Sequence, residues 1–144
     1  MENNIITIQS TINAPIEKVW QYWNDPQHIK GWAFASDTWE APTSENDLRT
    51  GGSFKTRMQE KGTKNGFDFG GVYTNVVDHK TIEYDMSKEA NDPNARHVKI
   101  GFEQTPEGVK ITQSFDPENE NSIEMQRQGW QAILDNFKKY VESN

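Results

Sequence analysis

The sequence predicts a single α+β domain in which an antiparallel sheet folds around one long helix. Short runs of alternating apolar and polar residues, separated by turns, extend from Trp32 to about Phe115, as is typical of antiparallel strands. A helical pattern closes the chain from about Asn121, and two shorter helical patterns follow the first strand. The length of 144 residues fits one domain with a substantial core.

The chain begins with a predicted strand and two short helices. In the stretch IITIQSTI, the side chains of Ile6, Ile8 and Ile12 share one face of a strand. The next stretch carries apolar residues at the spacing of one helical face: Ile16, Val19, Trp20 and Trp23. A shorter second helix is predicted from Pro26 to Gly31, because proline suits a helix start and glycine suits a helix end.

Six strands are predicted in the central region. They are the stretches DTWEA, GGSFKTRMQE, FDFGGVYTNVV, TIEYDM, HVKIGF and VKITQSF. The pair Asn65-Gly66 indicates a tight hairpin turn, and Gly70-Gly71 is expected to insert a bulge that swaps the faces of its strand. The stretches SKEANDPNAR and TPEG are predicted to be connections. Because the connections are short, neighbouring strands are expected to be antiparallel.

The last helix is predicted to begin near Asn121, with Glu124 as its partner in a capping box. Its broad apolar face carries these side chains: Ile123, Trp130, Ile133, Leu134, Phe137 and Val141. Gly129 lies beside this face, although glycine in a helix interior costs about 1 kcal/mol relative to alanine. We expect that its missing side chain lets the helix approach sheet or loop backbone closely, while Trp130 points into the enclosed space.

The composition narrows the classes of partner. The net charge of −7 makes nucleic acid and anionic membranes poor partners. The sequence has no cysteine, which excludes disulfides, thiol catalysis and zinc sites built on thiolates. The N-terminal stretch MENNIITIQS lacks the pattern of a signal peptide, and no apolar run approaches the ~20 residues of a membrane span. The expected location is the cytoplasm, without integral membrane association.

Five sequence motifs occur in a familiar order. They are AP-E-VW, NDPQHIKGW, DLRTGGSF, GGVY and the terminal GW-AIL-NFKKYVE. Through them, nearly the whole chain resembles the activator of heat-shock-protein-90 ATPase homologue-like (AHSA-type) family of the START-like or SRPBCC superfamily. The resemblance implies one START-like domain over residues 1–144 with the helix-grip fold of birch-pollen allergens. In that fold a curved antiparallel sheet wraps around a long C-terminal helix and leaves a cavity.

Members of this superfamily often bind lipids, sterols or polyketides, and some are cyclases. The residues expected to line such a cavity here are mainly aromatic: Trp32, Phe34, Trp39, Phe54, Met58, Tyr84, Met86, Phe102, Phe115, Trp130 and Leu134. Ordinary core packing is the alternative for each of them, and Trp20 and Trp23 are assigned to structure. Gln126, with Arg127 and Gln113, is predicted to form a polar end of the pocket that orients a ligand.

Three classes of function remain open. The leading hypothesis is non-enzymatic binding of a small hydrophobic or amphipathic molecule, without a metal or a cofactor. The second is a protein interaction module of the co-chaperone type, although the additional N-terminal domain of the eukaryotic co-chaperones is not expected in this chain. The third is a cyclase-like or hydrolytic enzyme.

Titratable side chains give the enzyme hypothesis little support from the sequence alone. The acids that could supply acid–base catalysis have no identifiable partner: Asp37, Glu40, Asp68 and Asp85. The three histidines lack the spacing of metal ligands and are assigned to the surface: His28, His79 and His97.

Overall fold

A computed structural model describes residues 5–86, 96–118 and 121–144 of the chain. The helices and strands occur in the following order: β1 (Ile6–Ile12), α1 (Ile16–Asn24), α2 (Pro26–Ile29), β2 (Trp39–Glu40), β3 (Ser44–Asn46), β4 (Ser53–Glu60), β5 (Gly66–Val77), β6 (Thr81–Met86), β7 (Arg96–Thr105), β8 (Gly108–Phe115) and α3 (Ile123–Ser143). The connection predicted for SKEANDPNAR lies almost wholly outside the described residues.

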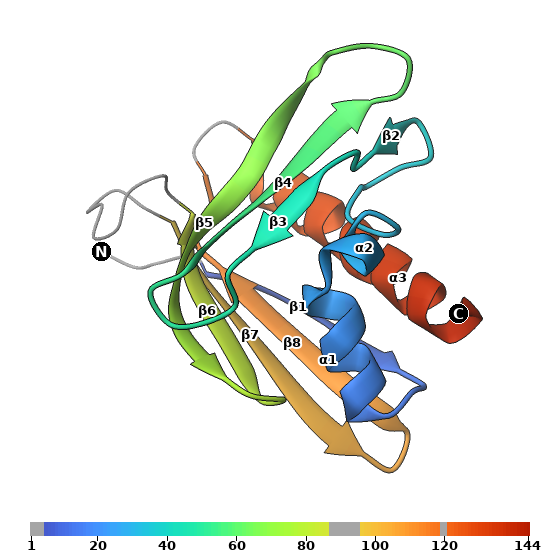
Figure 1. Ribbon diagram of the computed structural model, residues 1–144, viewed down its shortest axis with the longest axis vertical. Coiled ribbons are helices and arrows are strands. Elements are labelled where there is room, and N and C mark those ends of the chain that lie inside the picture. Colours follow the sequence, from blue (N-terminus) through green and yellow to red (C-terminus); the bar gives the residue numbers. More distant parts are fainter. Residues whose placement is uncertain (1–4, 87–95, 119–120) are drawn as a thin grey trace.

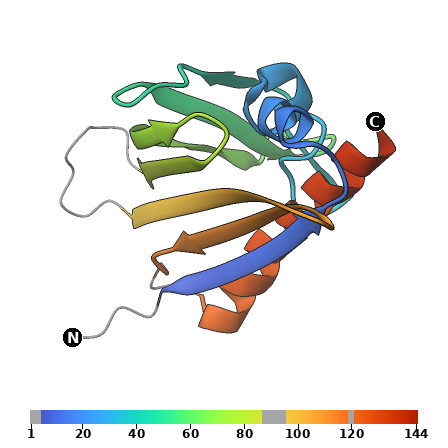
Figure 2. The ribbon, with the colours of Figure 1, turned by 90° about the horizontal axis from the view of Figure 1, so that it is seen from below.

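The strands form one curved sheet that grips the C-terminal helix (Figures 1 and 2). Their order is β1-β8-β7-β6-β5-β4-β2, with β3 also paired to β4, and every pairing is antiparallel. The helix α3 packs along β1, while α1 and α2 cover one end of the sheet's inner side (Figure 1). The α+β, helix-grip prediction is confirmed.

Alternation along the strands sets which side chains face the core. On β7 and β8 the predicted inward residues are buried, among them Val98, Ile100 and Ile111. On α3 the side chains of Leu134 and Phe137 are fully buried against them. On β7, β8 and α3 the buried positions are those that the alternation of the strands and the spacing of the helix predict. The inward faces of these elements could therefore be predicted from the sequence.

The predicted bulge at Gly70-Gly71 is wrong. Both glycines continue the pairing of β4 with β5, and the register shift in β5 comes later, between Tyr73 and Asn75. The glycines are needed for another reason. A Cβ atom at Gly71 would overlap the carbonyl oxygen of Asp85 on β6, so the missing side chain permits a close approach of neighbouring strands.

Two other local predictions are corrected. The turn between β4 and β5 places Gly62 at a φ of 78°, and the Thr63 N–H donates to the carbonyl oxygen of Glu60 at 3.2 Å, so Gly62 rather than Asn65-Gly66 makes the turn. The strand β3 was not predicted, because SEN has no apolar alternation and pairs only along the edge of β4.

The start of α3 also differs from the prediction. The N-cap is Ser122, whose side chain accepts a hydrogen bond from the Met125 N–H at 3.1 Å. Glu124 therefore falls inside the first turn, not at the capping-box position.

The prediction for Gly129 is wrong. A Cβ atom built there would meet nothing within 4 Å, leaving aside the neighbouring residues and the helix's own backbone. The helix therefore makes no close backbone approach at this position.

Candidate functional site

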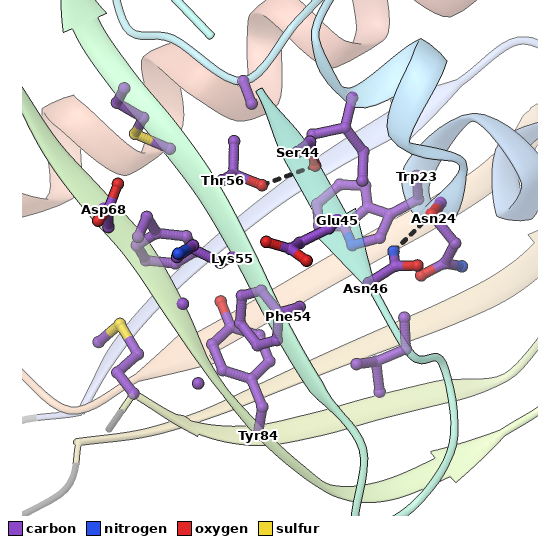
Figure 3. A pocket seen from close by; sticks show the side chains of 18 of the residues that line it. Trp23, Asn24, Ser44, Glu45, Asn46, Phe54, Lys55, Thr56, Asp68 and Tyr84 are labelled. Carbon is purple, nitrogen blue, oxygen red and sulfur yellow. Dashed lines mark hydrogen bonds between the residues drawn. The ribbon is translucent and has the colours of Figure 1, made fainter. Parts of the chain in front are cut away.

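A cavity of about 1020 Å³ lies between the inner face of the sheet, the helices α1 and α2, and the middle of α3. Its strand walls come mainly from β3, β4, β5 and β6, the part of the sheet away from β1 (Figure 3). This volume is at the upper end of the range typical of small-molecule sites, roughly 300–1,000 Å³.

One wall of the cavity is aromatic. The Phe54 ring lies 5.0 Å from the Tyr73 ring and 4.7 Å from the Tyr84 ring, measured between centroids. On the opposite side, Phe69 bridges this group to α3, with its ring centroid 5.9 Å from that of Trp130. Edge-to-face contacts of this kind hold rings in fixed orientations, so the wall is preformed.

The helical wall is built from α1, α2 and the segment that follows them. The rings of Trp23 and Trp32 both pack edge-on against Phe137 at 4.8 Å. The Trp32 Nε1–H donates to the carbonyl oxygen of Tyr22 at 2.9 Å, which fixes the indole against the cavity. Trp23, assigned to structure in the sequence, therefore also lines the cavity.

Buried polar groups face the space from the sheet. Tyr84 and Gln113 are only 5% and 6% exposed, and both line the cavity. Within the described part of the chain, neither the Tyr84 hydroxyl nor the Gln113 amide has a hydrogen-bond partner. Among the described residues, no fully buried side-chain polar atom lacks a hydrogen-bond partner, so these two polar groups are accessible from the cavity.

The two tyrosines, Tyr73 and Tyr84, lie directly opposite each other on β5 and β6. Burial raises the pKa of each phenol well above its ordinary value, and the charge of Arg96 lowers that of Tyr84 only in part. Both phenols stay neutral at physiological pH and act as hydrogen-bond donors.

Other polar groups at the cavity already have partners. The hydroxyls of Ser44 and Thr56 are 2.9 Å apart, and the Asn46 side-chain amide donates to the carbonyl oxygen of Asn24 at 2.6 Å (Figure 3). These bonds tie β3 to β4 and to α1. They stabilise the wall and leave the unpaired groups near the middle of the sheet as the polar contacts for a ligand.

Charge inside the cavity comes from Arg96. Its strand position on β7 shares the inward face with Val98, and its Nε donates to the carbonyl oxygen of Asp116 at 3.0 Å. Three acids lie along the cavity. Glu45 and Asp68 occupy outward strand positions, opposite Lys55 and Arg57 respectively, and Asp47, in the loop after β3, pairs with Arg49 at 2.8 Å. The inward charged position on the lining strands is therefore positive.

The structure places part of the predicted set along the cavity. The members that line it are Trp32, Phe54, Met58, Tyr84, Met86, Gln113, Trp130 and Leu134. The members that lie elsewhere are Phe34, Trp39, Phe102, Phe115, Gln126 and Arg127.

Packing explains why four aromatic members of the predicted set lie off the cavity. Phe102 is covered by Trp20 and Trp23, at 5.2 and 5.7 Å between centroids. The Trp130 indole stacks on Phe115 at 3.9 Å and separates it from the space. Phe34 packs beside the core, and Trp39 packs against Phe67 at the far end of the β4–β5 hairpin. Correct strand parity was therefore not enough to identify cavity residues.

Gln126 has a structural partner instead of a ligand-facing role. Its Oε1 accepts from the Glu118 N–H at 2.8 Å, and its Nε2 donates to the Asn121 carbonyl oxygen at 2.8 Å. The amide thus holds the chain that enters α3. Arg127 pairs with Glu124 at 3.1 Å on the half-exposed side of the helix. Of the predicted polar end, only Gln113 lines the cavity, and the other polar residues there include Tyr84 and Arg96.

Sequence reasoning missed Phe69, Tyr73 and Arg96. The supposed bulge at Gly70-Gly71 hid the fact that Phe69 and Tyr73 share one strand face. Arg96 was placed in the preceding loop, although it continues the alternation of Val98. Continuing the alternation of Val98 and Ile100 two residues back along the strand would have placed Arg96 on the inward face.

The outer face of the sheet carries a separate cluster of titratable groups. The His97 ring lies between two carboxylates, with Nδ1 2.8 Å from Asp85 and Nε2 3.0 Å from Glu83. Asp68 lies 3.7 Å from Arg57. The expectation that Asp85 and Asp68 have no partner is therefore wrong.

The other two histidines make aromatic contacts. The His28 ring stacks on Tyr22 at 3.8 Å between centroids, and its Nδ1 lies 2.9 Å from the Tyr140 hydroxyl. His79 stacks on Trp20 at 5.5 Å. Within the described ranges, no group of His, Asp and Glu residues has an arrangement that could hold a metal ion.

The curled antiparallel half-barrel around a long C-terminal helix defines a protein of the helix-grip class. A family model described as Activator of Hsp90 ATPase homolog 1-like protein matches residues 13–142, and the chain belongs to this family. No curated protein matches the sequence. No helix in the described ranges is long and apolar enough to cross a membrane.

Solved structures support the same assignment. The solution structure of an AHSA1-like protein from Aeromonas hydrophila is 38% identical, with a TM-score of 0.88 over 96% of this chain and 92% of that one. A protein from Cytophaga hutchinsonii is 47% identical, with a TM-score of 0.80 over 98% and 94%. A protein from Nitrosomonas europaea, at 20% identity and a TM-score of 0.81 over 96% and 94%, shows the shared fold alone.

Proposed function

We propose that this protein binds a small hydrophobic or amphipathic molecule, of lipid-, sterol- or polyketide-like character, without acting on it chemically. The observation that carries this proposal is the cavity of about 1020 Å³, with its aromatic walls and with the Tyr84 and Gln113 side chains, which have no hydrogen-bond partner among the described residues. Keeping such a space open forfeits packing contacts that a filled core would gain. An occupant of matching shape would restore those contacts.

Aromatic and aliphatic walls supply affinity, and a few polar groups supply orientation. Phe54, Phe69 and Trp130 offer faces for a flat or extended apolar body. The Tyr84 hydroxyl and the Gln113 amide would gain hydrogen bonds that they lack among the described residues. An amphipathic occupant uses both kinds of surface, and a purely apolar one uses only the first.

The pair of tyrosines, Tyr73 and Tyr84, is the feature of the cavity that bears most directly on the enzyme hypothesis. Neutral phenols at Tyr73 and Tyr84 can donate hydrogen bonds to a carbonyl oxygen, but their raised pKa values make them poor bases. Within the described ranges, no histidine lines the cavity, the acids Glu45 and Asp68 occupy outward strand positions, and Asp47 pairs with Arg49. The site therefore supports binding better than acid–base catalysis.

The direct test is native mass spectrometry of the purified full chain, followed by extraction and identification of any bound small molecule. A matched pair of variants on α3 assigns the binding to the cavity. Ile133→Trp fills the space, because Ile133 lines it, whereas Met125→Trp adds the same bulk at an exposed helix position. We expect the first variant to lose the bound mass and the second to keep it. Equal retention by both folded variants would contradict the proposal.

Membership of the family favours protein interaction as a second candidate function. It predicts that the purified chain changes the ATPase rate of a heat-shock-protein-90 chaperone, and that Ile133→Trp has the same effect as wild type. An unchanged ATPase rate at saturating concentration would contradict this candidate and leave ligand binding unaffected.

A further inference from the structure

The most informative unexplained feature of the cavity is the inward arginine at one end of it. Arg96 is half-buried, lies opposite Met86 in the β6–β7 pairing, and projects from the same strand face as Val98. Its Nε is occupied by the carbonyl oxygen of Asp116 at 3.0 Å. Among the described residues, the outer nitrogens of its guanidinium have neither an ion-pair partner nor a hydrogen-bond partner.

An arginine in a largely apolar wall has a physical cost. Burying a charge without a partner is unfavourable, whereas an anion that meets the guanidinium forms two parallel, charge-assisted hydrogen bonds. A neighbouring neutral donor strengthens such a site. Tyr84 supplies one, since it lies one strand over and two residues along from Arg96, on the same inner face, and is close enough for the charge of Arg96 to act on its phenol.

We infer that the occupant of this cavity is an amphipathic carboxylic acid, whose carboxylate binds Arg96 and the Tyr84 hydroxyl while its apolar body lies among Phe54, Phe69 and Trp130. This inference rests on the proposed function and names the ligand class of the same site. The single positive charge of Arg96 matches the single negative charge of a carboxylate. The net charge of −7 opposes ligands with more negative charges, such as phosphate monoesters.

The spacing along the strands separates this anchor from Gln113. Gln113 lies opposite Ile100, four residues beyond Arg96 on β7, which is about 13 Å at the rise of a strand. Gln113 is therefore farther from Arg96 along the sheet than Tyr84, which lies only two residues along. The carboxylate is accordingly assigned to Arg96 and Tyr84.

The experiment uses two fluorescent probes that differ only in their head groups, pyrenebutanoic acid and pyrenebutanol. Binding to the full chain is followed by pyrene anisotropy at neutral pH. For the wild type we expect the acid to bind about 10–100-fold more tightly than the alcohol, the range expected for a charge-assisted hydrogen bond. Arg96→Gln should remove this preference and leave the affinity for the alcohol unchanged, while Arg96→Lys should keep part of it.

Arg127→Gln is the matched control, because Arg127 lies on α3 away from the cavity and should leave both affinities unchanged. Equal affinity of the wild type for the two probes overturns the carboxylate inference. This comparison uses the wild-type protein alone and does not depend on the folding of any variant. A preference that survives in folded Arg96→Gln also overturns it, and in both cases binding in the cavity still stands. If neither probe binds the wild type, the inference and the proposed function fail together.

Discussion

Replacing Gly129 with alanine should stabilise the protein. Gly129 lies in the interior of α3, where glycine is about 0.8–1.0 kcal/mol less favourable than alanine. The added Cβ would meet no atom within 4 Å beyond the adjacent residues and the helix's own backbone, so no steric cost offsets the gain. The net change in the free energy of unfolding should be close to the full propensity difference. For a domain of this size that raises the melting temperature by about 2–4 °C.

The matched comparison is the same substitution at Gly71. There the new methyl group would overlap the backbone carbonyl oxygen of Asp85, and a sheet backbone cannot move aside as a side chain can. Gly71→Ala should therefore destabilise the fold by about 1–3 kcal/mol. Both variants are measured by thermal and urea denaturation under identical conditions. An unchanged or lower midpoint for Gly129→Ala would refute the reasoning, since it would mean that the helix needs glycine at this position.

Three further substitutions test the assignments of polar groups. Gln113→Met, close in shape, should change the free energy of unfolding of the free protein by less than about 1 kcal/mol, since the Gln113 amide bonds no other described residue and is accessible from the cavity; a larger loss in urea denaturation would contradict this. Gln126→Leu should cost about 1–3 kcal/mol without changing probe affinity, because the amide bonds backbone groups before α3; weakened binding would return Gln126 to the cavity. The third test is the pH dependence of His97. Burial acts to lower the pKa of His97, but hydrogen bonds to Asp85 and Glu83 raise it above the ordinary 6.5. Its stabilisation is full below 6.5 and is lost as pH rises through the raised pKa, so the stability difference between wild type and His97→Gln should fall as pH rises above 6.5. A difference that stays flat as pH rises would show that the outer-face cluster does not couple to folding.

The sequence predicted elements well where one periodicity governs a whole segment. The alternation of Val98, Ile100 and Phe102 and the stripe ending in Phe137 and Val141 correspond to buried positions. Burial on one face of a strand or helix is a local property of the pattern, so it needs no knowledge of partners. The same reasoning failed at Gly70-Gly71, because glycine suits both a bulge and a close approach of two strands. Only the position of the neighbouring strand distinguishes the two cases.

The cavity was harder to predict than the core. Phe115 and Phe54 both have inward parity, yet Phe115 lies under Trp130 while Phe54 lines the space. Which inward residue is covered depends on the path of α3 across the sheet, and periodicity carries no such information. The prediction of a polar end at Gln126 failed for a related reason. The burial of Gln126 follows from the helical pattern, but its hydrogen bond with the Glu118 N–H does not.

The two halves of the sheet differ in a way that explains why a cavity exists at all. The strands β1, β8 and β7 present mostly aliphatic side chains that are fully buried against α3, such as Ile6 and Ile111. The strands β4, β5 and β6 lie at the other end of the sheet, away from the contact between β1 and α3, and Gly70 and Gly71 let these strands approach one another closely. Their rings, such as Phe54 and Phe69, border the cavity, which therefore lies where the sheet does not pack directly on the helix. Two polar positions of the other half also border it, Arg96 on β7 and Gln113 on β8, so the aliphatic packing against α3 and the cavity meet along these two strands.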